Sequence, residues 1–246
     1  GTVTNSSTIT NDGTFNIQVT SVLGVLINNN TFTNNKTLDV LGTLTNNKSA
    51  TLTNNSTGTI ESNKNINNYG TITNNNRITL NSISVFNNYD VITNNNTITN
   101  AGNMTNYETD TANALFSDSG VISNNLTFDN TGIGTLTNNS KILNTSRFTN
   151  KGTFSDTKYF LNNRIFINNS ILNINYLFEN NDTFNNIKLG SLNIVNIGTN
   201  GILSNKSIGI IRNDKDGTVN INGKLNNTTS TNKFDNSGSV YILGAG

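Results

Sequence analysis

Cysteine, proline, histidine and tryptophan are all absent from this chain of 246 residues. Without cysteine there are neither disulfides nor thiolate metal sites. Without histidine the commonest general base and the commonest transition-metal ligand are missing. Charged residues make up only 12% of the chain and the net charge is +1, so nothing resembles the basic footprint of a nucleic-acid-binding protein. No apolar run is long enough for a membrane helix.

Two residue types dominate what is present: 57 asparagines and 38 threonines. Such a composition can indicate disorder. The regular spacing of apolar residues argues against disorder. Leu26, Phe32, Leu38 and Leu44 are six residues apart, and occasional steps of eight occur elsewhere. Six is neither the helical period nor simple alternation, and it suits a strand of three or four residues followed by a short turn. Threonine, isoleucine, valine and phenylalanine also favour strands.

One short phrase recurs about twenty residues apart: an apolar residue between threonines, closed by an asparagine pair. Its copies begin at Thr31, Thr51 and Thr71, with Val91 replacing a threonine in the fourth. The repeat predicts an all-β chain forming a single parallel β-helix, or β-solenoid, of about 18–20 residues per three-sided coil.

Stacked coils place residues one period apart above each other, about 4.8 Å away. The predicted apolar columns are Phe32, Leu52, Ile72 and Ile92; Val40, Ile60 and Leu80; and Phe148, Phe166 and Phe184. The predicted amide ladders are Asn34, Asn54, Asn74 and Asn94, with Asn35, Asn55, Asn75 and Asn95 beside them. Columns of asparagine can satisfy each other's donors and acceptors at otherwise buried corners.

The solenoid is expected to run continuously over residues 1–246, with a loop or register break at 108–120, where the phrase is lost. Glycine often precedes a strand, as in Gly58-Thr59-Ile60 and Gly70-Thr71-Ile72. We expect those glycines to occupy corners that require positive φ, and asparagine to tolerate the same conformation at other corners.

Gly70-Thr71-Ile72-Thr73-Asn74 and its tandem relatives resemble the β-solenoid repeats of bacterial surface adhesins, such as filamentous-haemagglutinin-like and autotransporter passenger segments. The resemblance covers nearly the whole chain and implies a right-handed helix. The 18-residue period also resembles the left-handed hexapeptide-repeat helix, but the small residue which that family favours two positions before each aliphatic varies here. Proteins with such repeats serve as stalks, adhesins, viral fibres and spikes.

Candidate ligand groups are few. Asp90 and Asp110 lie one 20-residue period apart with Glu108 beside them, a weak candidate cation site that we interpret chiefly as solvated turn carboxylates. The segment Asn213–Gly217 is similar to a calcium loop, but the EF-hand spacing fails and a turn is expected. Catalysis needs convergent ionisable groups, and the 14 acidic residues are scattered. We therefore expect no enzyme and no cofactor.

The leading functional hypothesis is a structural protein, a stiff rod in an extracellular, cell-surface or virion-surface fibre or filament, with self-association by stacked coils. One alternative is an adhesin or glycan-binding module of a larger surface protein. Another is ice binding, because the outward threonines at Thr31/Thr33, Thr51/Thr53 and Thr71/Thr73 resemble the threonine rows of insect-type antifreeze proteins. No nucleic-acid partner and no membrane span are expected.

Overall fold

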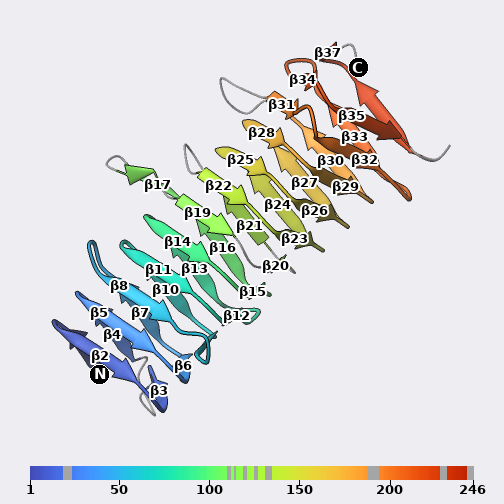
Figure 1. Ribbon diagram of the computed structural model, residues 1–246. Helices are drawn as coiled ribbons and strands as arrows, with labels where there is room; N and C mark the ends of the chain where they lie inside the picture. Colours follow the sequence, from blue (N-terminus) through green and yellow to red (C-terminus); the bar gives the residue numbers. More distant parts are fainter. Residues whose placement is uncertain are drawn as a thin grey trace.

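The protein is described by a computed structural model at residues 1–18, 24–109, 112–113, 115–118, 121–124, 127–130, 135–187, 194–227 and 232–242. There the chain is all-β, with three long parallel sheets of 12, 12 and 11 strands and one short antiparallel pair. Successive strands pass from sheet to sheet and return to the first one coil further along, which makes a three-sided β-solenoid (Figure 1). In these ranges no helix occurs, hence none long and apolar enough to cross a membrane.

Each sheet takes one strand from each coil. Sheet A contains β1 (Thr2–Asn5), β4 (Val25–Asn28), β7 (Thr43–Asn46), β10 (Asn65–Asn68), β13 (Val85–Asn88), β16 (Asn103–Asn106), β21 (Thr127–Asn130), β24 (Arg147–Asn150), β27 (Ile165–Asn168), β30 (Thr183–Asn186), β33 (Ile210–Asn213) and β36 (Lys233–Asn236). Sheet B contains β2 (Thr8–Asn11), β5 (Thr31–Asn34), β8 (Thr51–Asn54), β11 (Thr71–Asn74), β14 (Val91–Asn94), β19 (Leu115–Asp118), β22 (Thr135–Asn138), β25 (Thr153–Asp156), β28 (Ile171–Ile174), β31 (Ile194–Ile197), β34 (Thr218–Ile221) and β37 (Ser239–Ile242). Sheet C contains β3 (Thr14–Asn16), β6 (Thr37–Val40), β9 (Thr59–Ser62), β12 (Arg77–Leu80), β15 (Thr97–Asn100), β20 (Val121–Asn124), β23 (Lys141–Asn144), β26 (Tyr159–Asn162), β29 (Leu177–Asn180), β32 (Ile202–Asn205) and β35 (Lys224–Asn227).

The four-residue strand explains the recurring phrase. In β5 and most other strands the second and fourth residues are buried, while the first and third are partly exposed. Strand geometry sends alternate side chains to opposite faces. The apolar residue and the first asparagine of the phrase therefore point inward, and the two threonines point outward.

The apolar column of Phe32, Leu52, Ile72 and Ile92 is confirmed, because β5, β8, β11 and β14 pair in parallel with these residues in register. The phenylalanine column is confirmed as well. The ring centroids of Phe148 and Phe166 lie 5.4 Å apart and those of Phe166 and Phe184 lie 5.3 Å apart. These rings are fully buried and fill the interior of the second half of the solenoid.

The predicted column of Val40, Ile60 and Leu80 is wrong. Ile60 pairs with Leu38 and Ile78, whereas Val40 and Leu80 both pair with Ser62. The period of twenty fails here because the corners before β8 and β9 are four residues long instead of two. Partners in successive coils are 18 residues apart at the shortest, as for Asn144 and Asn162, and 27 apart between Asn186 and Asn213. Corner length, not strand length, varies.

The stretch at 108–120 departs from the solenoid. It contains β17 (Glu108–Thr109) and β18 (Ala112–Asn113), which pair antiparallel. β19 then returns to sheet B beside β14, in parallel and with all four residues of each strand paired. The solenoid strands therefore keep their register across this stretch.

The role expected for the glycines is wrong. Gly58 and Gly70 do not have positive φ, but a Cβ on Gly58 would lie 2.3 Å from the carbonyl oxygen of Asn34. A Cβ on Gly70 would lie 2.4 Å from that of Ala50. Glycine is needed because adjacent coils approach closely at these corners. Among the described non-glycine residues only Ser49 and Ser207 have positive φ, so asparagine is not chosen for that conformation.

Candidate functional site

Buried asparagine ladders are the most regular chemical feature of the molecule. Asn34, Asn54, Asn74 and Asn94 each end a strand of sheet B and are fully buried. The side-chain amide nitrogens of the first three each donate to the Oδ1 of the next asparagine at 2.8 Å, and that of Asn94 donates to Asp118 at 2.7 Å. The predicted inner ladder is therefore confirmed.

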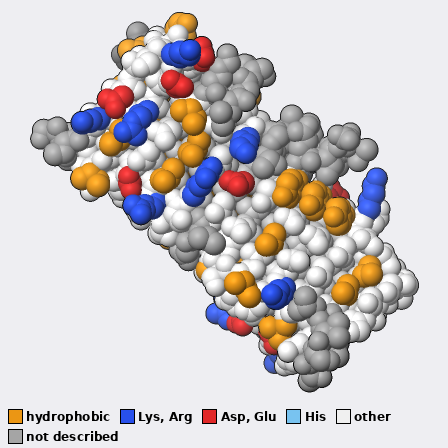
Figure 2. All heavy atoms as spheres, turned by 180° about the vertical axis from the view of Figure 1, so that it is seen from behind, with side chains coloured by type: hydrophobic (Ala, Val, Ile, Leu, Met, Phe, Trp, Pro, Cys, Tyr) orange, Lys and Arg blue, Asp and Glu red, His pale blue; other side chains and the backbone are white. Residues whose placement is uncertain are grey.

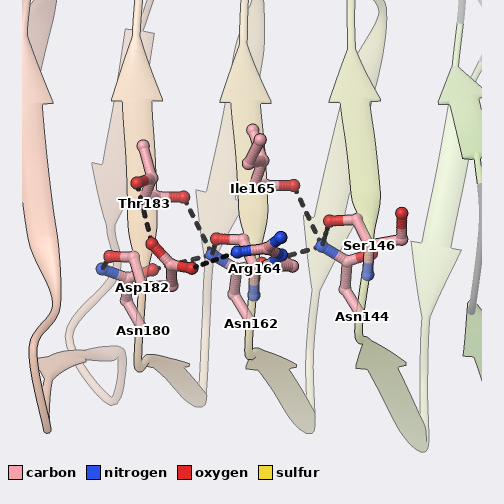
Figure 3. Close-up of polar contacts among 8 residues, drawn as sticks. All are labelled: Asn144, Ser146, Asn162, Arg164, Ile165, Asn180, Asp182 and Thr183. Carbon is pink, nitrogen blue, oxygen red and sulfur yellow. Dashed lines mark hydrogen bonds and ion pairs between the residues drawn. The ribbon is translucent and has the colours of Figure 1, made fainter.

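Each ladder amide also satisfies the backbone at its corner. In the region drawn in Figure 3, Nδ2 of Asn162 donates to Oδ1 of Asn180 at 2.8 Å, to the carbonyl of Arg164 at 3.0 Å and to that of Thr183 at 2.9 Å. Oδ1 of Asn162 accepts from Asn144 at 2.8 Å. A carboxamide supplies two N–H donors and an acceptor on one short side chain. Buried carbonyls that turn the chain thus find partners without water.

The three ladders differ in extent. In sheet A the chain of amide bonds is unbroken from Asn5 to Asn236. In sheet C the fourth positions of β6, β9 and β12 are Val40, Ser62 and Leu80, and the ladder runs from Asn100 to Asn227. In sheet B the amide bonds run from Asn11 to Asp118, and one more joins Asn138 to Asp156.

Two aspartates, Asp118 and Asp156, replace asparagine at the fourth positions of sheet B, and Asp156 is the last polar member there. It is fully buried, and its Oδ1 accepts from Asn138 at 2.6 Å, but its Oδ2 has no hydrogen-bond partner. The next residue in the column is Ile174. Burial raises the pKa of Asp156 to about 7, against the opposing hydrogen bonds from Asn138 and the Lys158 backbone. The side chain resembles an asparagine only when it is protonated.

The outer asparagine ladder is seen in part. Asn55 donates to Asn35 at 2.6 Å and Asn95 donates to Asn75 at 2.8 Å. These side chains are solvent-exposed or partly exposed, so each bond contributes less than its buried counterpart.

Threonine covers much of the outer face of sheet B in the first half. Register stacks Thr8, Thr31, Thr51 and Thr71 in one column and Thr10, Thr33, Thr53, Thr73 and Thr93 in the next. Thr8 and Thr10 extend the rows by one coil beyond the triplets noted in the sequence. Val91 follows Thr71 in the first column. The rows form a regular lattice of hydroxyl and methyl groups, about 4.8 Å between coils and about 7 Å along the strand.

Only Asp90 of the three residues of the candidate cation site has a described side chain, so the site stays a prediction. Burial raises the pKa of Asp90, although the Lys48 ammonium opposes this. Asp110 and the side chain of Glu108 lie outside what the structure describes. Across the described ranges no three acidic, histidine or cysteine side chains gather as metal ligands do. At Asn213–Gly217 the chain makes a turn, in which the Gly217 N–H donates to the Asp214 carbonyl at 2.8 Å.

Charge on the outer surface is dispersed. Figure 2 shows basic and acidic side chains scattered over one face rather than gathered in a single patch. Arg77 pairs with Glu61 at 3.4 Å, and both are about half exposed. Glu179 accepts from Lys206 and from the Tyr159 hydroxyl; burial acts to raise its pKa, but these two contacts outweigh it and lower the pKa. Exposed pairs of this kind contribute about 0–1 kcal/mol each.

Sequence reasoning missed a tyrosine ladder. Tyr69, Tyr89 and Tyr107 follow the last asparagine of β10, β13 and β16, and their rings stack with centroids 4.6 and 4.8 Å apart. Burial, followed by the neighbouring phenols, raises the pKa of Tyr89. The spacings of 20 and 18 residues could have revealed the ladder, since they equal the coil lengths at these positions.

No protein-family model matches the chain, and neither a curated protein nor a solved structure matches it significantly.

We predict that Asn74→Ala destabilises the solenoid by about 2–5 kcal/mol, because the buried Nδ2 of Asn54 loses its acceptor and the buried Oδ1 of Asn94 loses its donor. Urea unfolding followed by circular dichroism measures the change. Asn75→Ala, one residue along on the corner, is the matched control and should change stability by about 0.5 kcal/mol or less. Equal effects of the two substitutions would contradict a structural role for the inner ladder.

We predict that stability depends on pH through Asp156. Its pKa of about 7 in the folded chain exceeds the ordinary 3.8. The stability due to the neutral acid is therefore fully present below about pH 4, declines as the pH rises, and is lost above about pH 7. The loss is on the order of 4 kcal/mol.

Asp156→Asn should remove most of this pH dependence and raise the urea midpoint at about pH 8, since an amide stays neutral and can donate where Oδ2 cannot. The control is Asp182→Asn, at a corner where the carboxylate lies 3.8 Å from Arg164. It should leave the dependence of stability on pH unchanged. A flat profile in the unmodified protein would rule out this role for Asp156.

Proposed function

We propose that the chain is a structural protein, a stiff β-solenoid rod that forms or contributes to an extracellular, cell-surface or virion-surface fibre. The observation that carries the proposal is the unbroken amide ladder of sheet A, in which every coil donates in the same direction along the axis. A uniform one-dimensional stack of this kind builds length without requiring a unique core. The resemblance to surface-adhesin repeats supports the same placement outside the cell.

The two ends of the described stack are complementary. Asn5 donates forward to Asn28 at 2.7 Å, which leaves its Oδ1 where each later ladder member accepts from the preceding coil. Asn236 accepts from Asn213 at 2.8 Å, and its Nδ2 donates to the Gly238 carbonyl at 3.1 Å, as other ladder amides do at their own corners. A further coil, from the same chain or from a second copy, could continue the ladder in register. Val3 and Ile242 are 46% and 78% exposed at these ends and would be covered by such a coil.

Small-angle X-ray scattering and negative-stain microscopy test the rod. Twelve stacked strands predict a particle roughly 50–55 Å long, and end-to-end stacking predicts longer filaments whose length grows with protein concentration. Globular scattering would contradict the rod. Single particles at every concentration would contradict self-stacking. Such a result would still agree with a role as a stalk within a longer chain.

The threonine rows of sheet B favour a second candidate function, ice binding. Nine threonines stand in two adjacent columns over five coils, interrupted only by Val91. A rigid lattice of hydroxyl and methyl groups can hold ordered water at its surface. Thermal hysteresis measures this activity. The double substitution Thr53→Lys and Thr73→Lys should abolish it, whereas Thr99→Lys, on the outer face of sheet C, should not. Absence of hysteresis in the unmodified protein would eliminate the candidate.

A further inference from the structure

A groove of about 570 Å³ opens at the corner between sheets B and C in the second half of the solenoid. Two residues, Asn175 and Tyr176, join β28 to β29, but the four residues 198–201 join β31 to β32 one coil later. The longer corner carries Thr199 and Asn200 on the rim of the groove. The volume lies within the range of small-molecule sites.

Glycine leaves part of the groove wall without side chains. A Cβ on Gly201 would lie 2.0 Å from the carbonyl oxygen of Ile174, so the two coils approach backbone to backbone there. No larger residue fits without displacing the corner. The stacking of the coils therefore fixes the path of this corner.

Some polar groups of the groove are already bonded, because Thr157 donates to the Asn138 carbonyl at 2.9 Å and Thr199 accepts from Asn222 at 3.0 Å, but others differ from those at comparable corners. Asn181 donates to Asn163 across coils at 2.8 Å, and Asn55 does the same to Asn35. Among the described residues, by contrast, the side chains of Asn175, Tyr176 and Asn200 make no hydrogen bond. Tyr176 is 53% exposed, so its ring and its hydroxyl are both available.

The groove has a positively charged side chain, that of Lys224, and no negatively charged one among its lining residues. Across the described residues no acidic side chain forms an ion pair with Lys224. An unpaired ammonium beside uncommitted amides suits a ligand that has both a carboxylate and hydroxyl groups.

We infer that this groove binds a saccharide bearing a carboxylate. The apolar C–H face of a sugar ring packs on the exposed ring of Tyr176. Its hydroxyls bond to the carboxamides of Asn175 and Asn200, and its carboxylate pairs with Lys224. The site goes beyond the rod proposed above and does not depend on it, because a single soluble copy contains every residue involved.

Titration of the full chain with uronic-acid- and sialic-acid-terminated oligosaccharides, followed by calorimetry or NMR, tests the inference. The same oligosaccharides with the carboxyl reduced to an alcohol are the matched ligands. We expect saturable binding to the acidic forms and at least tenfold weaker binding to the reduced forms. Binding should also fall at least tenfold in Tyr176→Ala, and Lys224→Gln should remove the preference for the acidic forms.

Tyr241→Ala is the control for Tyr176→Ala, because Tyr241 has nearly the same exposure, 54%, but lies in β37, away from the groove. Lys215→Gln is the control for the charge. Circular dichroism verifies that each variant folds. Absence of binding at millimolar ligand, equal binding to acidic and reduced saccharides, or an unchanged affinity in Tyr176→Ala would each overturn the site. None of these results would affect the rod.

Discussion

The structure depends on one interaction, the hydrogen bond from a buried asparagine side chain to its counterpart one coil away. A three-sided coil must turn every few residues, and each turn leaves backbone carbonyls facing the interior. Asn162 satisfies two of these carbonyls and one neighbouring amide oxygen while accepting from the coil before it. Because each coil needs the same bonds, each needs the same residue. This accounts for the high asparagine content better than corner conformation does, since no described asparagine has positive φ.

One ladder runs the whole length of the described solenoid, and the other two cover different, overlapping parts of it. Sheet A has an amide in every described coil, whereas sheet C has Val40, Ser62 and Leu80 at its fourth positions while sheet B has asparagine. Beyond Asp156 the roles reverse, because Ile174 and Ile197 occupy sheet B while sheet C continues through Asn180 to Asn205. Most coils therefore have asparagine at two or three of their fourth positions, and Val40, Leu80, Ile174 and Ile197 are among the residues that replace it. Asp156 is the last polar residue of the sheet B column before Ile174, so no amide follows it in the next coil.

Much of this fold follows from the sequence alone, because the phrase that begins at Thr31 encodes both faces of a strand and its turn. The Phe32 column and the Asn34 ladder could be predicted where corners keep a constant length. The Val40 column was mispredicted because a constant period of twenty was applied where coil length changes, although the apolar steps of eight at Leu44, Leu52 and Ile60 mark the two longer corners. The glycine corners were placed correctly but for the wrong reason, because close approach between coils appears only in three dimensions. The groove at Tyr176 was missed for the same reason: it needs corners of unequal length in adjacent coils.

Hydrogen exchange of the side-chain amides, resolved by NMR, tests the central claim most directly. If buried amide ladders hold the coils together, the Nδ2 protons of Asn54 and Asn74 exchange as slowly as the backbone amides of their own strands. Those of Asn55 and Asn95, on the exposed corners, then exchange orders of magnitude faster. If the inner and outer side-chain amides exchanged at similar rates, the ladders would be a consequence of the stacking and not its cause.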